Sequence, residues 1–154
     1  MHYRLLLAST DNLQQLLPLV EAYHEFEHIH MTGKNRKQAI HGLLSDSSLG
    51  GIWLIVVDIA IAGYIALTFG YSIEFGGKDA FIDEFYIRPE FRGKGLGKQS
   101  LRQIQQEAKA LDIHALHLEV AASNTRAQHL YAQTNFQARS KYMLMSAYLT
   151  ETSV

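Results

Sequence analysis

Apolar and polar positions follow two different periods along the chain, and these predict helices near the N-terminus and strands after residue 50. Apolar residues at 13, 16, 17, 20, 23 and 26 recur at helical spacing, with Thr10 or Asp11 as the expected N-cap. A second short helix is expected over residues 35–44, and residues 3–8 have strand character. The N-terminal third therefore combines one strand with two helices.

From Gly51 the chain is rich in β-branched and aromatic residues, which predicts antiparallel strands at 52–57, 61–69 and 80–87. A glycine-rich loop, a helix over 98–111, a strand over 114–120 and a helix after Asn124 follow. A strand, helix and strand in this order form a crossover, so the strands around 81–87 and 114–120 should be parallel. Residues 136 and 142–149 are expected to supply the last strands. The fold class is α/β (α+β), a mixed sheet with helices on its faces.

Composition narrows the function classes. A chain of 154 residues with 47% hydrophobic and 19% charged residues fits a single globular domain over 1–154. The longest apolar run, 52–57, is far shorter than the ~20 residues that cross a bilayer, and the N-terminus shows no signal pattern. A cytoplasmic protein without a membrane partner is expected. With no cysteine, disulfides, thiolate metal sites and cysteine nucleophiles are excluded. A net charge of −1 also argues against a nucleic-acid binder.

Residues 92–98, Arg-Gly-Lys-Gly-Leu-Gly-Lys, join a predicted strand to a predicted helix. Unpaired amides at a helix start attract phosphate, and glycines allow close approach of the backbone. Residues 88–98 carry four cations and one anion, so a local polyanion site is expected. The segment does not match the Walker motif of nucleotide-binding proteins. Arg92 stands at the position of its first glycine, and Gln99 stands where the motif has the Ser or Thr that binds magnesium. The dinucleotide-binding motif Gly-x-Gly-x-x-Gly does not match either, because its third glycine is missing whether the motif starts at Gly93 or at Gly95. A nucleotide-binding regulator is therefore disfavoured.

Two motifs carry a family resemblance. Residues 83–97, with Arg92, Gly95 and Gly97 at the key positions, resemble motif A of the GNAT N-acetyltransferases. Residues 124–131, Asn-Thr-Arg-Ala-Gln-His-Leu-Tyr, followed by Asn135-Phe136, resemble a second motif of that family. The family has Gly where this chain has Asn135, and Asn is the residue that best replaces Gly in a left-handed backbone. The resemblance covers about residues 3–149, and it implies a largely antiparallel central sheet of six to seven strands with a splayed parallel strand pair.

The resemblance implies acetyl-CoA as the donor, with its pyrophosphate on the loop amides and its pantetheine arm in the splayed gap. Asn124 is expected to bond that arm, to cap its own helix, or to do both. The positions to which the resemblance assigns acetyl-CoA are Phe85, Tyr86, Ile87, Arg92, Gly93, Lys94, Gly95, Leu96, Gly97, Lys98, Asn124 and Tyr131.

Acetyl transfer to an amine needs a base for the ammonium and an acid for the departing thiolate. The resemblance assigns the acid to Tyr131. For the base, Asp83 and Glu84 should point to opposite faces of a regular strand unless a bulge intervenes. Similarity to spermidine/spermine acetyltransferases favours Asp83, while a base that acts through water keeps Glu84 open.

The acceptor is expected to be a primary amine of a small molecule or peptide, attacked directly without a covalent enzyme intermediate. Charge outside residues 88–98 is mildly acidic, which favours a cationic acceptor. The candidate acceptor residues are Tyr23, Glu25, Glu27, His28, Tyr71 and Glu74. His24 and His28 have a spacing able to bind zinc, yet no third ligand accompanies them, so no metal site is expected. The alternative function is an acyl-CoA sensor without turnover. A homodimer through residues 140–149 is compatible with the family.

Overall fold

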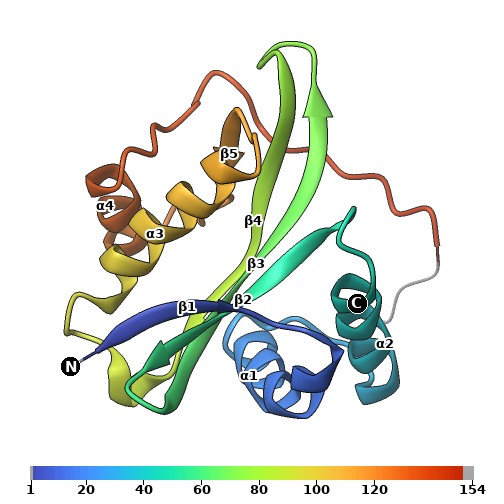
Figure 1. Ribbon diagram of the computed structural model, residues 1–154. Helices are drawn as coiled ribbons and strands as arrows, with labels where there is room; N and C mark the ends of the chain where they lie inside the picture. Colours follow the sequence, from blue (N-terminus) through green and yellow to red (C-terminus); the bar gives the residue numbers. More distant parts are fainter. Residues whose placement is uncertain (1, 151–154) are drawn as a thin grey trace.

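The computed structural model describes residues 2–150 and contains one five-stranded sheet in the order β1-β2-β3-β4-β5. The pairs β1–β2, β2–β3 and β3–β4 are antiparallel, and β4–β5 is parallel, as predicted. The helices α1 and α2 cover one face of the sheet, and α3 and α4 cover the other (Figure 1). The element bounds are β1 Tyr3–Leu7, η1 Thr10–Asn12, α1 Leu13–Phe26, α2 Gly33–Ser45, β2 Gly50–Val57, β3 Ala60–Ser72, β4 Gly77–Ile87, η2 Pro89–Phe91, α3 Leu96–Ala110, β5 Ala115–His117 and α4 Thr125–Gln133.

The N-cap of the first helical segment is Ser9, one residue before the first of the two predicted positions. Ser9 caps the 3₁₀ turn η1 by accepting a hydrogen bond from the Asp11 amide at 3.2 Å, and Asn12 Oδ1 accepts one from the Ser9 amide at 2.9 Å. The prediction of Thr10 or Asp11 was wrong because a tight turn precedes the α-helix. Phe26, expected in the buried stripe, is 63% exposed, whereas His24 is 4% exposed. His24 is therefore part of the core-facing side of α1.

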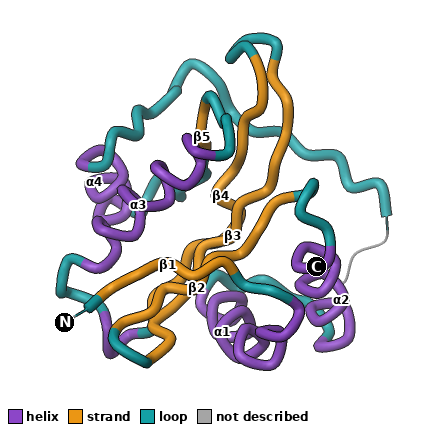
Figure 2. Tube along the Cα trace, in the orientation of Figure 1, coloured by secondary structure: helices purple, strands orange, loops and turns teal. Residues whose placement is uncertain are grey.

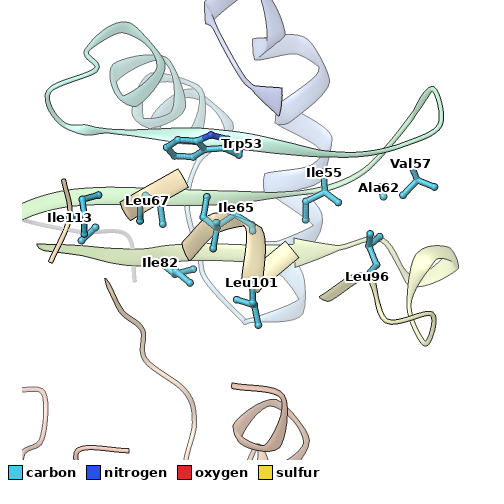
Figure 3. Packing of buried hydrophobic residues seen from close by; sticks show 13 residues of the cluster. Trp53, Ile55, Val57, Ala62, Ile65, Leu67, Ile82, Leu96, Leu101 and Ile113 are labelled. Carbon is cyan, nitrogen blue, oxygen red and sulfur yellow. The ribbon is translucent and has the colours of Figure 1, made fainter. Parts of the chain in front are cut away.

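The inner strand β2 explains why the core has two layers. All eight of its residues are buried, so β2 is covered on both faces. Trp53, Ile55 and Val57 pack toward α3 (Figure 3), and the alternate side chains at 52, 54 and 56 pack toward α1 and α2. This alternation follows from the two-residue period of a strand.

A β-bulge in β4 reverses this alternation next to the site. Glu84 lies opposite Ala66 and Ile82 lies opposite Leu67, which leaves Asp83 as the extra residue. Ile82 accordingly belongs to the core on the α3 side, while Tyr86, four residues later, belongs to the core on the α1 side. In a regular strand these two side chains would share a face, so the bulge decides where Glu84 points.

Within residues 2–150 the sheet has five strands and not the predicted six to seven. The expected strand over 114–120 pairs only at Ala115–His117, and the residues after α4 contain no strand up to residue 150 (Figure 2). Arg139 holds this part of the chain against the β3–β4 hairpin through an ion pair with Glu74 at 2.9 Å and a contact of 5.1 Å with the Phe75 ring. A strand must form hydrogen bonds with a neighbouring strand. The residues after α4 run away from the sheet, so no strand forms there in the described chain. Within residues 2–150, none of the helices combines the length and the apolar character needed to span a membrane.

Candidate functional site

The loop between η2 and α3 has the geometry of an anion site. Gly93 and Gly95 have positive φ angles of 78° and 80°, and Gly95 is the N-cap of α3. The amides of Leu96, Gly97 and Lys98 lie in the first turn, where no intrahelical acceptor exists. A Cβ built on Gly93 or Gly95 meets no atom within 4 Å, so the space beside the loop is open. The loop therefore offers free N–H groups, a helix dipole and access, which fits a phosphate ligand.

Arg92 anchors this loop. Its Nε donates a hydrogen bond to the Ile87 carbonyl at 2.7 Å, and its guanidinium lies 5.6 Å from the Phe26 ring centre and 5.5 Å from that of Tyr86. The side chain thus joins the loop to the end of β4 and to α1. Sequence reasoning had assigned Arg92 only to the ligand, and its contact with the Phe26 ring on α1 was not foreseen.

A cleft opens where β4 and β5 separate. The two strands pair from Asp79 to Phe81 on β4, and the described sheet shows no pairing between them beyond that point. A cavity of about 620 Å³ fills the gap and is lined by residues of β4, of the segment after β5, of α4 and of α1. Asn124 borders the cleft, and its Oδ1 accepts a hydrogen bond from the Ala127 amide at 3.1 Å, which caps α4 as predicted.

Tyr131 faces this cleft from the end of α4. The Phe136 amide donates to the Tyr131 carbonyl at 3.0 Å, Asn135 has a φ of 74°, and the Tyr131 and Phe136 rings meet edge to face at 5.8 Å. This is the Schellman arrangement, so the prediction that Asn135 replaces Gly in a left-handed position is confirmed. Burial raises the pKa of Tyr131, and the charge of Glu27 raises it further, so the phenol stays protonated at neutral pH.

Asp83 lies between two cavities. It lines the cleft and also a smaller cavity of about 280 Å³ under α1 and α2. Within residues 2–150 no hydrogen bond reaches its carboxylate, which is exposed at the rim. Partial burial by the walls raises its pKa, and the neighbouring charge of Glu84 raises it further, whereas a positive charge on His24 would act in the opposite direction. Asp83 is thus a carboxylate without a hydrogen-bond partner in the described chain, and its raised pKa means that it binds a proton more tightly than an ordinary aspartate does.

Glu84, by contrast, is held by two donors. Tyr64 donates its hydroxyl to Glu84 Oε1 at 2.7 Å, and His24 Nε2 lies 2.6 Å from Oε2. On the other side of the imidazole, Arg36 Nε donates to His24 Nδ1 at 3.1 Å. Sequence reasoning missed Tyr64 and Arg36 and considered His24 only as a metal ligand. The one available signal was that His24 follows Val20 by four residues and so continues the buried stripe of α1.

The smaller cavity is lined by both apolar and polar side chains. The apolar ones include Val20, Ile29, Ile40 and Leu43, and the polar ones are Tyr64, His24, Arg36, Asp83 and Glu84. A molecule in this cavity would therefore contact apolar side chains and two carboxylates. This arrangement suits an acceptor with a cationic head and an apolar stem.

The six candidate acceptor residues separate into two groups. Tyr23 and Glu27 line the cleft. Neither cavity is lined by the other four, Glu25, His28, Tyr71 and Glu74, and Glu74 is engaged by Arg139 at the tip of the β3–β4 hairpin. His28 lies beyond the last residue of α1 with a φ of 57°, so it does not continue the helix face that carries His24. In the described chain no cluster of three or more ligating side chains could hold a metal ion.

Comparisons with known proteins agree with this geometry. The model of the Acetyltransferase (GNAT) family matches residues 13–136. An uncharacterized N-acetyltransferase, YycN, of Bacillus subtilis is 43% identical over 60 residues, which cover 39% of this chain and 38% of that protein. The chain thus matches about two fifths of the length of this curated relative. A putative [ribosomal protein bS18]-alanine N-acetyltransferase of Bacillus subtilis is 29% identical over 77% of this chain and 74% of its own length.

Solved structures extend the likeness to nearly the whole chain. An integron cassette protein from the mobile metagenome of Cole Harbour Salt Marsh superimposes with a TM-score of 0.84 and 30% identity, covering 96% of this chain and 91% of its own. The family model, the two sequence motifs and the splayed strands with their glycine loop lead to one conclusion. This chain belongs to the GNAT acetyltransferase family.

Proposed function

We propose that this protein transfers the acetyl group of acetyl-CoA to a primary amine by direct nucleophilic attack. The observation that carries the proposal is the cleft between β4 and β5, which is lined by both Asp83 of β4 and Tyr131 of α4. Family membership supports the reaction class. A sensor that only binds acyl-CoA would have no use for a free carboxylate and a buried phenol at the same place.

The donor site is formed by backbone groups. The free amides from Gly93 to Lys98 would hold the pyrophosphate at the start of α3, assisted by the charges of Lys94 and Lys98. Over Phe85 to Ile87, β4 pairs with β3 on one edge and in the described sheet has no pairing with β5 on the other. This second edge would bind the pantetheine arm in the cleft, which Asn124 also lines. One β4 amide near Ile87 would stabilise the oxyanion that forms on the acetyl carbonyl.

The proton steps follow from the two side chains. Asp83 accepts a proton from the acceptor ammonium and leaves a neutral amine, whose nitrogen attacks the acetyl carbonyl carbon. When the carbon–sulfur bond breaks, Tyr131 gives its phenolic proton to the thiolate, and the resulting phenolate takes the second proton of the attacking nitrogen. The products are an amide and CoA, with the first proton of the ammonium left on Asp83. Both raised pKa values suit these roles, because Asp83 holds the proton it receives and Tyr131 remains protonated until the leaving group needs it.

The acceptor class follows from the small cavity and from Glu27. Carboxylates at positions 27, 83 and 84 surround the approach, so a cationic amine is favoured. A volume of about 280 Å³ admits one amino-acid-sized side chain or a linear amine, whereas a multi-ring aminoglycoside would have to remain largely outside. We therefore place small linear amines and peptide amines first among the acceptors.

The C-terminal residues support a homodimer. Tyr142, Met143, Leu144, Met145, Tyr148 and Leu149 are 60–93% exposed. Six apolar side chains within eight residues are more than the scattered exposure that is normal for a monomer. In the described sheet β5 has a single neighbour, β4, so its outer edge is free. A second copy of the chain would cover the apolar segment and pair with the free edge.

A thiol-release assay with acetyl-CoA tests the reaction. The panel should include polyamines, amino acids, basic peptides with free N-termini and an aminoglycoside, and CoA binding should be measured in parallel by calorimetry. Turnover with a linear or peptide amine supports the proposal. Tight CoA binding without turnover across the panel would favour the sensor, and absence of CoA binding would contradict the donor site.

A further inference from the structure

Four polar side chains from four elements form one hydrogen-bonded chain that lines the smaller cavity. Arg36 on α2 donates to His24 on α1, His24 contacts Glu84 on β4, and Tyr64 on β3 donates to the other oxygen of Glu84. The donor–acceptor distances are 3.1, 2.6 and 2.7 Å. The arrangement joins residues that are up to 60 positions apart in the sequence, and it lies directly beside Asp83.

The first bond determines the tautomer of His24. A guanidinium has only donors, so His24 Nδ1 must accept the hydrogen bond from Arg36 Nε. The ring proton then resides on Nε2, which donates it to Glu84 Oε2. Tyr64 supplies a hydroxyl proton to Oε1. Each oxygen of Glu84 therefore receives one donor, and the orientation of this carboxylate is set from two sides.

The contact with Arg36 fits only the neutral form of the His24 ring. An imidazolium would point a Nδ1–H group at the Nε–H group of Arg36, with donor against donor and cation against cation. The titratable and charged groups around the ring are Arg36 from α2, Glu84 and Asp83 from β4, Tyr64 from β3 and Tyr23 on α1 itself. With a neutral ring, the charge of Glu84 is not cancelled by a cation in direct contact.

The consequence concerns the neighbouring carboxylate. Because Glu84 is engaged, Asp83 is the carboxylate that remains free toward both cavities. The bulge places the two groups on adjacent residues, so a fixed charge at Glu84 acts on Asp83 at short range. If Glu84 were released, both carboxylates would be able to approach the acceptor ammonium, and the proton would be shared between two positions.

We propose that His24 and Arg36 are positioning residues of the acetyl transfer, which hold Glu84 in place as a fixed anion so that Asp83 alone receives the proton of the acceptor amine. The proposal rests on the function proposed above. A purely structural role would affect only the stability of the fold. The proposed positioning role predicts that changes in the network alter kcat and its pH dependence and leave the affinity for acetyl-CoA unchanged.

The kinetic test compares pairs of variants at His24. His24→Leu removes the donor to Glu84, and kcat with the amine should fall by roughly 10- to 100-fold, with the KM for acetyl-CoA unchanged. His24→Gln retains an amide donor and should recover most of the loss. Melting temperatures identify variants that fail to fold. Wild-type kcat in His24→Leu would overturn the proposal, as would a His24→Gln variant that is folded yet as slow as His24→Leu.

The pH test uses Arg36. In Arg36→Leu the imidazole is free to take a second proton and to pair with Glu84 as a cation. This offsets the negative charge that favours the proton on Asp83, so the acidic limb of kcat/KM should move to lower pH. Arg36→Lys keeps a donor and a positive charge and should keep the limb close to that of the wild type. A limb that does not move in Arg36→Leu would contradict the role of Arg36.

A measurement without substrate separates this proposal from the proposed function. Nitrogen-15 NMR of the His24 ring in the free protein should show a neutral ring protonated on Nε2, and in Arg36→Leu the doubly protonated ring should appear as pH falls. The opposite tautomer in the wild type would overturn the proposal whatever the activity. Wild-type silence against the whole amine panel would instead overturn the proposed function, even if the tautomer were as expected.

Discussion

Gly95 offers a test in which stability and ligand binding can be read separately. Its φ of 80° lies in the left-handed region, and a Cβ built there meets no atom within 4 Å. Gly95→Ala therefore introduces no steric overlap with neighbouring side chains. Its cost comes from the backbone conformation alone, which an L-residue adopts with a penalty of about 1–2 kcal/mol.

The size of the effect follows from this penalty. Alanine also restricts the unfolded chain, which returns about 0.4–1 kcal/mol, so the net destabilisation should be about 1 kcal/mol. For a domain of this size, that lowers the melting temperature by about 2–4 °C. If the loop relaxes toward negative φ, one or more amides turn away from the phosphate. Loss of one charge-assisted hydrogen bond weakens CoA binding by about 10- to 100-fold.

Gly42→Ala is the matched control. Gly42 lies inside α2, is exposed, and has open space around its Cβ without a positive φ. Alanine there should stabilise the protein by about 0.5–1 kcal/mol and leave CoA binding unchanged. Thermal unfolding and calorimetry with CoA measure both quantities. A Gly95→Ala protein that is destabilised but binds CoA like the wild type would refute the assignment of the phosphate site to this loop.

Three further changes test the remaining parts of the site. Tyr131→Phe should reduce kcat by about 10²- to 10⁴-fold with unchanged CoA affinity, since only the proton donor is lost; a normal kcat would exclude the acid role. Because burial and Glu84 raise the pKa of Asp83 above its ordinary 3.8, kcat/KM of the wild type should fall as pH drops through that raised value. Asp83→Asn should abolish turnover yet raise the melting temperature at pH 7, because the folded state binds the Asp83 proton more tightly than the unfolded state and loses stability as pH rises. Leu144→Glu should shift the mass measured by light scattering from that of a dimer to that of a monomer. The same mass for the wild type and for Leu144→Glu would contradict the exposed segment as the interface.

The local motifs could be predicted because the residues that form each of them are close together in the sequence. The glycine loop needs only a strand, a turn with positive φ and a helix start, all within residues 87–98. The exchange of Gly for Asn135 was also predictable, because a helix end depends on a few neighbouring residues. The predicted strand at 142–149 was wrong for the opposite reason. Its nearly continuous apolar residues favour a strand, but a strand must also form hydrogen bonds with a neighbouring strand. In the described structure this segment runs away from the sheet and pairs with no edge, although the outer edge of β5 is free.

The choice between Asp83 and Glu84 shows what sequence reasoning could not decide. A regular strand would place them on opposite faces, and the bulge at Asp83 depends on the register between β3 and β4. The partners of Glu84 lie 60 residues earlier at His24 and 20 residues earlier at Tyr64. No local sequence pattern shows that residues so far apart in the chain are in contact. The structure leaves one carboxylate free and one held.

By itself, the sequence determined the order of elements, the anion-binding loop and the family resemblance, because helix periodicity, strand alternation and glycine conformation are properties of neighbouring residues. The tertiary structure alone decided which carboxylate is held, how Arg92 is anchored between Phe26 and Tyr86, and that the last apolar segment leaves the sheet. These outcomes depend on register, packing angle and the burial of polar groups that must find partners from other elements. Such partners are fixed only when the helices close over both faces of the sheet.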